Sequence, residues 1–170
     1  MGKTREPRAR MRARALSLCL SESRDKIMES NYSSYMLKMS DDAAESPAHG
    51  SFCDAQAPSA VARFKHLMEA SYFNRMRFHS AQSGAVAHFG IASDPKLTKF
   101  WRKKTFYDES ADKEIRSNRR GTISFAGLPG AKNKRSTSIV INFADNLKLD
   151  QQAYTPFAYI IWGMNTVDQI

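Results

Sequence analysis

The stretch Tyr72–Ile91, with the sequence YFNRMRFHSAQSGAVAHFGI, decides the fold of this chain. It contains two runs with the composition of β-strands, Arg77–Ala81 and Ala85–Ile91. The residues Gln82-Ser83-Gly84 separate these runs and are typical of a turn. We therefore predict two adjacent strands here, with further strands before and after them.

A second strand-rich segment follows at Arg120–Asn146, RGTISFAGLPGAKNKRSTSIVINFADN. Gly121–Gly127 is rich in residues that favour strands, and Thr137–Phe143 is a nearly continuous β-branched and apolar run. Such a run is typical of a strand that is buried on both faces. Phe157–Trp162 predicts a last strand, and Met164–Ile170 predicts the start of a short helix.

One helix is clear upstream, over Ala60–Ala70, and Pro58 suits its first turn. Its apolar residues fall on one face at helical spacing; they are Val61, Phe64, Leu67 and Met68. Tyr35–Met39 and Ser51–Ala55 are short strand candidates. Many short strands with one clear helix predict a mainly β protein, a β-barrel or sandwich with an attached helix.

The 170 residues are enough for one domain with a substantial core. We assign residues 1–34 to a basic, disordered tail and residues 35–170 to the folded domain. Within the tail, the composition of Arg8–Leu20 is compatible with a basic helix. However, the leucines at the end of this segment recur every second residue and not at the three- or four-residue spacing of a helical face. They are Leu16, Leu18 and Leu20.

The net charge of +9 is concentrated in a few segments, the N-terminus above all. A cationic tail of this kind favours contact with nucleic acid or anionic membranes without indicating a fold. Cys19 and Cys53 have no metal or CxxC spacing and are expected to be free thiols, which favours an intracellular, cytoplasmic protein. The Arg-rich start is also compatible with organelle targeting. No apolar run approaches the roughly 20 residues of a membrane span.

The segment from Asp94 to Asn118 is charged and aromatic, and its lack of sustained periodicity predicts a long loop with at most a helical turn. It contains FWRKK at positions 100–104, followed by Phe106 and Tyr107. Aromatic rings between cations suit single-stranded nucleic acid. The interpretation we favour is that the rings anchor the loop to the domain.

Five motifs together resemble the cyclophilins in order and spacing. They are APSAVARFKHLMEASYFNRMRFHS, GAVAHFGIASDP, RGTISFA, STSIVINFADN and LDQQAYTPFAYIIWGMNTVD. The resemblance implies an antiparallel β-barrel with one or two capping helices and a ligand groove on its outer surface. It also implies cis/trans isomerisation of X-Pro bonds, a reaction that needs neither a metal nor a cofactor. The expected partner is a proline-containing peptide or protein.

The resemblance also assigns the groove positions, and most of them are substituted. The catalytic arginine of the family, which follows Phe-His, corresponds to Ser80, while Arg77 is expected on the opposite face of the strand. The implied substrate-binding positions are Val86, His88, Ser138, Val140, Leu149 and Tyr154. We therefore expect catalysis to be weak or lost.

Two functions follow as hypotheses. The first is a peptidyl-prolyl isomerase family protein that acts on or binds X-Pro bonds. The second is a non-catalytic protein- or RNA-interaction module on the same scaffold, with the Arg-rich tail as contact. The family pattern also continues with a further helix and a C-terminal strand, which are missing from the pattern here. We expect the basic N-terminal region or a partner to fill that place, unless the sequence is an incomplete product.

Overall fold

The computed structural model describes residues 15–19, 34–38, 48–53, 56–109, 117–127 and 131–170. Its strands are β1 (Ala15–Cys19), β2 (Ser34–Lys38), β3 (Ala48–Phe52), β4 (Met76–Arg77), β5 (Ser80–Gln82), β6 (Val86–Phe89), β7 (Thr122–Phe125), β8 (Ile139–Asn142) and β9 (Pro156–Trp162). All pairs are antiparallel and form one sheet in the order β4-β1-β2-β3-β9-β7-β8-β6-β5. The predicted mainly β architecture is confirmed.

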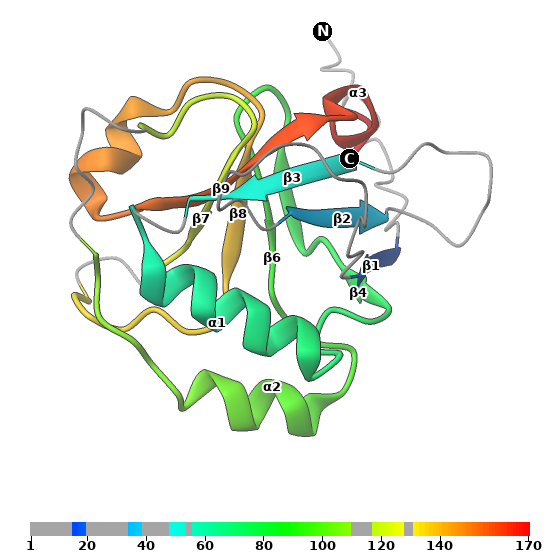
Figure 1. The fold of residues 1–170 in the computed structure, drawn as a ribbon, viewed down its shortest axis with the longest axis vertical. Helices are drawn as coiled ribbons and strands as arrows, with labels where there is room; N and C mark the ends of the chain where they lie inside the picture. The colour runs from blue at the N-terminus through cyan, green and yellow to red at the C-terminus, as the bar shows by residue number, and fades with distance from the viewer. Residues whose placement is uncertain (1–14, 20–33, 39–47, 54–55, 110–116, 128–130) are drawn as a thin grey trace, which may run out of the picture.

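The sheet curls back toward its own beginning. Its two outermost strands, β4 and β5, are separated in the chain by only Phe78 and His79. The ends of the strand order are therefore held close together by the chain itself. Figure 1 shows the strands wrapped in this way, with the helices α1 and α2 below them.

The helices are α1 (Pro58–Glu69), α2 (Pro95–Arg102), the 3-10 helix η1 (Leu147–Gln152) and α3 (Met164–Val167). The prediction for α1 is confirmed, with Pro58 in the first turn. Its buried face contains Val61, Phe64, Leu67 and Met68. Apolar side chains at helical spacing bury one stripe of the helix against the sheet.

The helix α2 occupies the first part of the segment Asp94–Asn118, where the sequence predicted a long loop with at most a helical turn. The Asp94 carboxylate accepts a hydrogen bond from the Lys96 N–H at 2.8 Å, and Pro95 occupies the first turn. These are favourable start signals for a helix. Leu97 and Trp101 pack against the core, so tertiary contacts stabilise a segment that has little periodicity of its own.

The N-terminal segment contains a strand where composition suggested a helix. β1 pairs with β2 on one side and with β4 on the other. In the pair with β4, Ala15 lies opposite Arg77. The prediction of a helix over Arg8–Leu20 is therefore wrong for residues 15–19. Pairing on both sides outweighs helix propensity, which is a weak prior. The other parts of residues 1–34 lie outside the described residues.

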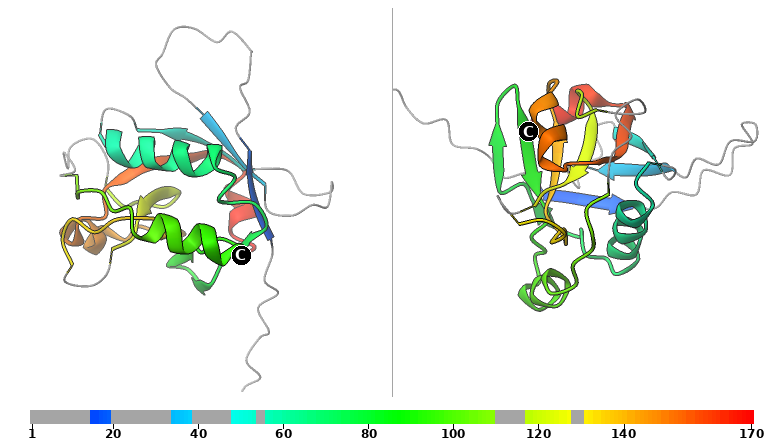
Figure 2. Two further views of the ribbon diagram at one scale, coloured as in Figure 1. Left: turned by 90° about the horizontal axis from the view of Figure 1, so that it is seen from below. Right: turned by 90° about the vertical axis from the view of Figure 1, so that its left-hand side faces the viewer.

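The core is an aromatic cluster centred on α1. The ring of Phe64 lies 5.7 Å from Phe52, 5.0 Å from Phe73 and 5.1 Å from Phe157, measured between centroids. Buried rings at these distances contribute beyond the area they bury. In Figure 2 the same helix is seen from two other sides against the strands. No helix among the described residues is long and apolar enough to cross a membrane.

Candidate functional site

A straight row of residues crosses four strands on one face of the sheet. Ser80 of β5 lies opposite His88 of β6, and His88 lies opposite Val140 of β8. Val140 in turn lies opposite Ser124 of β7. Directly opposed residues of antiparallel strands share a face. The register therefore brings together three positions that the sequence assigned to the groove, namely Ser80, His88 and Val140.

A second row on this face lies two residues further along each strand. It runs from Gln82 through Val86 to Asn142. The intervening residues Phe89, Ile139 and Ile141 point to the other face and belong to the hydrophobic core. This alternation separates the candidate site from the core by the thickness of one sheet.

Exposure falls steadily along the first row. Ser80 is exposed at the sheet edge, His88 is half-buried, and Val140 is only 1% exposed. Val140 is buried without being part of the main core cluster. Something other than the core must therefore cover it.

A polar network fastens the chain around η1 over this face. The Asn118 side-chain amide donates to Asp150 Oδ1 at 2.6 Å and to the backbone oxygen of Tyr154. The side chains of Ser124 and Asn142 donate to Asn118 Oδ1 at 2.8 and 3.2 Å. The network holds η1 and the following turn, hence Leu149 and Tyr154, beside the two rows.

The sequence prediction missed this network. Asn118, Ser124 and Asn142 are all 0% exposed. Buried polar groups need hydrogen-bond partners, and these residues satisfy one another. The sequence contains part of the information needed to predict the network. Ser124 and Asn142 are polar residues within otherwise apolar strands, and a polar side chain in such a strand needs a hydrogen-bond partner.

The two histidines at this edge are close to each other. The rings of His79 and His88 lie 6.2 Å apart. Burial lowers the pKa of both imidazoles, and proximity to His79 lowers that of His88 further. A neutral His88 at pH 7 can both donate and accept a hydrogen bond, as peptide binding requires.

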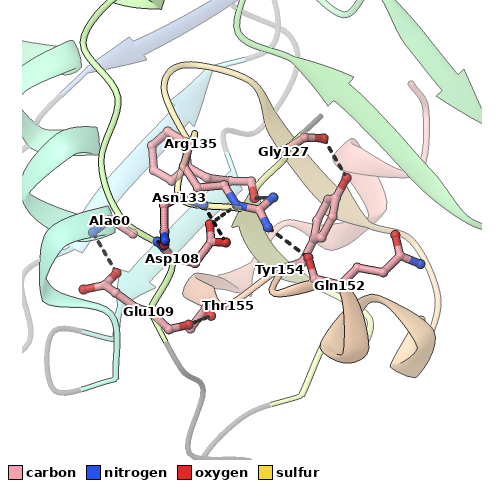
Figure 3. A network of polar contacts seen from close by, with 10 residues as sticks. Ala60, Asp108, Glu109, Gly127, Asn133, Arg135, Gln152, Tyr154 and Thr155 are labelled. Atoms are coloured by element: carbon pink, nitrogen blue, oxygen red, sulfur yellow. Dashed lines mark hydrogen bonds and ion pairs between the residues drawn. The ribbon is translucent and has the colours of Figure 1, made fainter. Parts of the chain in front are cut away.

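Arg135 is a buried cation that contacts β7, η1 and Tyr154. It is 4% exposed and donates to Asp108 Oδ1 at 2.7 Å and to the backbone oxygens of Phe125 and Gln152. Its guanidinium also lies 4.9 Å from the centre of the Tyr154 ring. Figure 3 shows Asp108, Gln152 and Tyr154 around Arg135. Each of its three nitrogens donates a hydrogen bond, so this arginine is a structural tie between Asp108, β7 and η1.

The remaining predicted positions are less tightly defined. Ser138, one residue before β8, is half-buried and uses its backbone oxygen to accept from the Ala126 N–H. The Tyr154 hydroxyl lies 3.4 Å from the Gly127 oxygen, a weak hydrogen bond. Arg77 is exposed in β4 and lines a separate cavity with Arg75 and Met76.

No group of three potential metal ligands occurs among the described residues.

Comparison with known proteins gives a family match and structural neighbours. Residues 51–170 match the family described as cyclophilin type peptidyl-prolyl cis-trans isomerase/CLD. No curated protein sequence matches the chain. Two solved structures of a cyclophilin type peptidyl-prolyl cis-trans isomerase from Cryptosporidium parvum share the fold.

The structural likeness is broad, although the sequences have diverged. The first was solved in the presence of the dipeptide Ala-Pro; it is 24% identical, covers 72% of this chain and 77% of its own, and has a TM-score of 0.60. The second is also 24% identical, covers 72% and 75%, and has a TM-score of 0.59. The family match spans most of the chain, so this protein belongs to the cyclophilin type peptidyl-prolyl cis-trans isomerase family.

Proposed function

We propose that this protein binds X-Pro peptides on the face that carries Ser80, His88 and Val140, and that its isomerase turnover is weak or absent. The observation that carries the proposal is the residue at the exposed end of the row. It is Ser80, directly opposite His88, where the family resemblance places the catalytic arginine.

The chemistry of the reaction explains why this position matters. Rotation about the X-Pro bond must break amide resonance, which gives a barrier of about 18–20 kcal/mol. A donor near the prolyl nitrogen withdraws the lone pair from resonance and stabilises the twisted state. A serine hydroxyl is short and neutral, so it cannot reproduce the reach and charge of a guanidinium. Loss of one preorganised donor typically costs about 10²–10³ in rate.

Neither Arg135 nor Arg77 belongs to the row that contains Ser80. The Arg135 guanidinium is bound to Asp108 and to two backbone oxygens. Arg77 belongs to β4, which pairs with β1 and has no pairing with β6. Arg135 is therefore held by other contacts, and Arg77 stands on a strand at the other end of the sheet order.

The apolar part of the face favours a shallow proline site. Val86 and Val140 stand where the resemblance implies larger pocket side chains, and Val140 is almost fully covered. Less apolar surface is then available to hold a pyrrolidine ring, and binding weakens with the area lost. Leu149 and Tyr154, half-buried beside the rows, supply the remaining contact area.

Binding itself is supported by the groups that remain. His88 and Ser138 keep polar atoms on the face, and the structural neighbour from Cryptosporidium parvum was solved in the presence of Ala-Pro. Positioning of a peptide needs hydrogen bonds and contact area, whereas acceleration needs the donor at the prolyl nitrogen. The proposal separates these two requirements.

A protease-coupled assay with a chromogenic Ala-Ala-Pro-Phe peptide tests the proposal. We expect turnover near the uncatalysed background for the wild-type chain. Ser80→Arg is expected to restore only part of the family's activity, because Val86 and Val140 remain. Ser83→Arg adds the same charge in the exposed β5–β6 turn and should have no effect. Wild-type turnover at the level of an active cyclophilin, or full rescue by Ser80→Arg alone, would contradict the proposal.

A further inference from the structure

Two adjoining cavities form a groove along one side of the sheet edge. The first has a volume of about 610 Å³ and the second about 430 Å³. They share Ile91 and Ala92. The first is also lined by Arg75, Met76, Arg77, His79 and Ser93, and the second by Pro95, Thr98, Lys99, Arg102 and Lys103. We call this feature the cationic groove.

The charge of the cationic groove has one sign. Arg75 and Arg77 stand on the wall made by β4 and the turn before it. Lys99 and Arg102 stand on α2, and Lys103 directly follows this helix. No Asp or Glu occurs among the described residues that line it. Asp94 is the acid nearest in sequence, and its carboxylate accepts from the Lys96 N–H at the start of α2.

These five cations differ from the arginines elsewhere in the structure. Arg120 makes a two-pronged ion pair with Asp168, and Arg135 is bound to Asp108. Within the described part of the chain, the side chains of the five groove cations have neither a hydrogen bond nor an ion pair. Cations on both walls of a concave surface reinforce one another's field and attract anions.

The helix α2 is held so that it presents its cations to the groove. Its lining residues recur at positions 95, 98, 99, 102 and 103, which form one helical face. Trp101 lies on another face, packs against the core and lies 5.5 Å from the Arg63 guanidinium. Trp101 thus anchors the helix and leaves the basic face free. The interpretation that all the aromatic rings of this segment are anchors does not hold for Phe100 and Tyr107, which are 53% and 77% exposed.

The floor of the groove is apolar. Ile91 is 51% exposed at the junction of the two cavities, and Ala92 and Met76 are buried beneath. A half-exposed isoleucine between two cationic walls suits an apolar side chain flanked by carboxylates. Single-stranded nucleic acid would instead require aromatic stacking platforms. Among the described lining residues, the only ring is the imidazole of His79.

We infer that the cationic groove is a docking surface for an acidic peptide segment of a partner protein, with an apolar residue seated on Ile91. The match is one of complementary charge on both walls and apolar contact on the floor. This binding does not depend on isomerase turnover, since none of the groove residues belongs to the Ser80–His88–Val140–Ser124 row.

The first test measures fluorescence anisotropy of a labelled peptide, Glu-Glu-Leu-Glu-Glu, titrated with the full chain. The double variant Lys99→Gln/Arg102→Gln should weaken binding about fivefold or more, because two charges are lost from one wall. The control Lys132→Gln/Lys134→Gln removes the same charge from an exposed loop and should change affinity less than twofold. Equal weakening by both variants, or no measurable binding by the wild type, would overturn the inference.

A second comparison tests the apolar floor. Ile91→Ser should weaken Glu-Glu-Leu-Glu-Glu while leaving Glu-Glu-Gly-Glu-Glu unchanged; equal effects on both peptides would contradict the seat on Ile91. A labelled uridine decamer is titrated in parallel. If it binds more tightly than the peptide and loses affinity with Lys99→Gln/Arg102→Gln, the groove is a nucleic-acid site and the inference is wrong. Unchanged unfolding midpoints show that each variant is folded.

Discussion

The two faces of the β6–β8 strand pair differ in burial and in the kind of side chain they carry. On one face Phe89, Ile139 and Ile141 are at most 1% exposed and join the aromatic core. On the other, His88 and Val140 lie in a row that ends at the exposed Ser80. The core face carries the side chains that the fold needs, whereas the opposite face carries the positions to which we assign peptide binding.

The contrast teaches that fold and catalysis rest on separate residues even where they share strands. Burial of the core face stabilises the sheet whatever stands on the other side. A catalytic donor contributes nothing to that burial, so it can be replaced without loss of the fold. The polar network around Asn118 makes the separation firmer, because it keeps η1 on the site face and, of the groove positions, uses only the backbone oxygen of Tyr154.

The largest expected effect comes from Gly90, where β6 ends. Its φ of +117° is rare for other residues, and a Cβ there would lie 2.0 Å from the backbone oxygen of Thr137, just before β8. Gly90→Ala should lower the free energy of unfolding by roughly 4 kcal/mol or more, because backbone must move. Gly84 precedes β6 with φ +68° and open space around it, so Gly84→Ala should cost only about 1 kcal/mol. If urea unfolding gave equal losses of stability for Gly90→Ala and Gly84→Ala, the close contact between Gly90 and Thr137 would be contradicted.

The next effect compares two ion pairs. Arg135 and Asp108 have side-chain exposures of 5% and 14%, whereas Arg120 and Asp168 have 45% and 39%. Arg135→Met should lower the free energy of unfolding by about 3 kcal/mol, because it leaves a largely buried carboxylate unpaired. Arg120→Met should cost about 1 kcal/mol or less, since exposed pairs are screened by water and salt. Urea unfolding at low ionic strength measures both. An Arg135→Met variant as stable as Arg120→Met would show that Arg135 is not the tie described.

The smallest effect concerns the histidines of the site face. Burial lowers the pKa of His79 and His88, so the unfolded chain binds protons more readily. The stability that this difference contributes is present above about pH 6.5 and is lost as the pH falls toward the lowered folded pKa. When the pH is lowered from 7.5 to 5, the free energy of unfolding should therefore fall less for His88→Gln than for the wild type. His66→Gln, on the exposed side of α1, serves as control and should follow the wild-type profile; identical profiles for all three would refute the shift.

The sequence predicts most of the strands and α1 because their patterns reflect local burial. The continuous apolar run in Thr137–Phe143 becomes β8, and the helical spacing from Val61 to Met68 becomes the buried face of α1. α2 and β1 were missed for the same physical reason. Each is stabilised mainly by partners distant in sequence, α2 by contact with the core and β1 by pairing with β2 and β4.

The site was predictable only as a set of positions. The order of motifs identifies Ser80, His88 and Val140, yet their alignment in one row depends on the register of four strands. In the sequence Arg135 stands close to two further cations, Lys132 and Lys134, but its burial against Asp108 depends on the loop that carries that carboxylate. Charge in a sequence does not indicate which cations a distant acid will neutralise.

Exchange NMR on an Ala-Pro-containing peptide tests the central claim most directly, because one sample reports binding and catalysis together. Adding the peptide should shift the resonances of His88 and Tyr154, while the cis and trans peptide signals keep exchanging at the slow uncatalysed rate, with time constants of tens to hundreds of seconds. Exchange cross-peaks on a subsecond timescale at catalytic protein concentration would contradict the account, since the face without an arginine would then be an active catalyst.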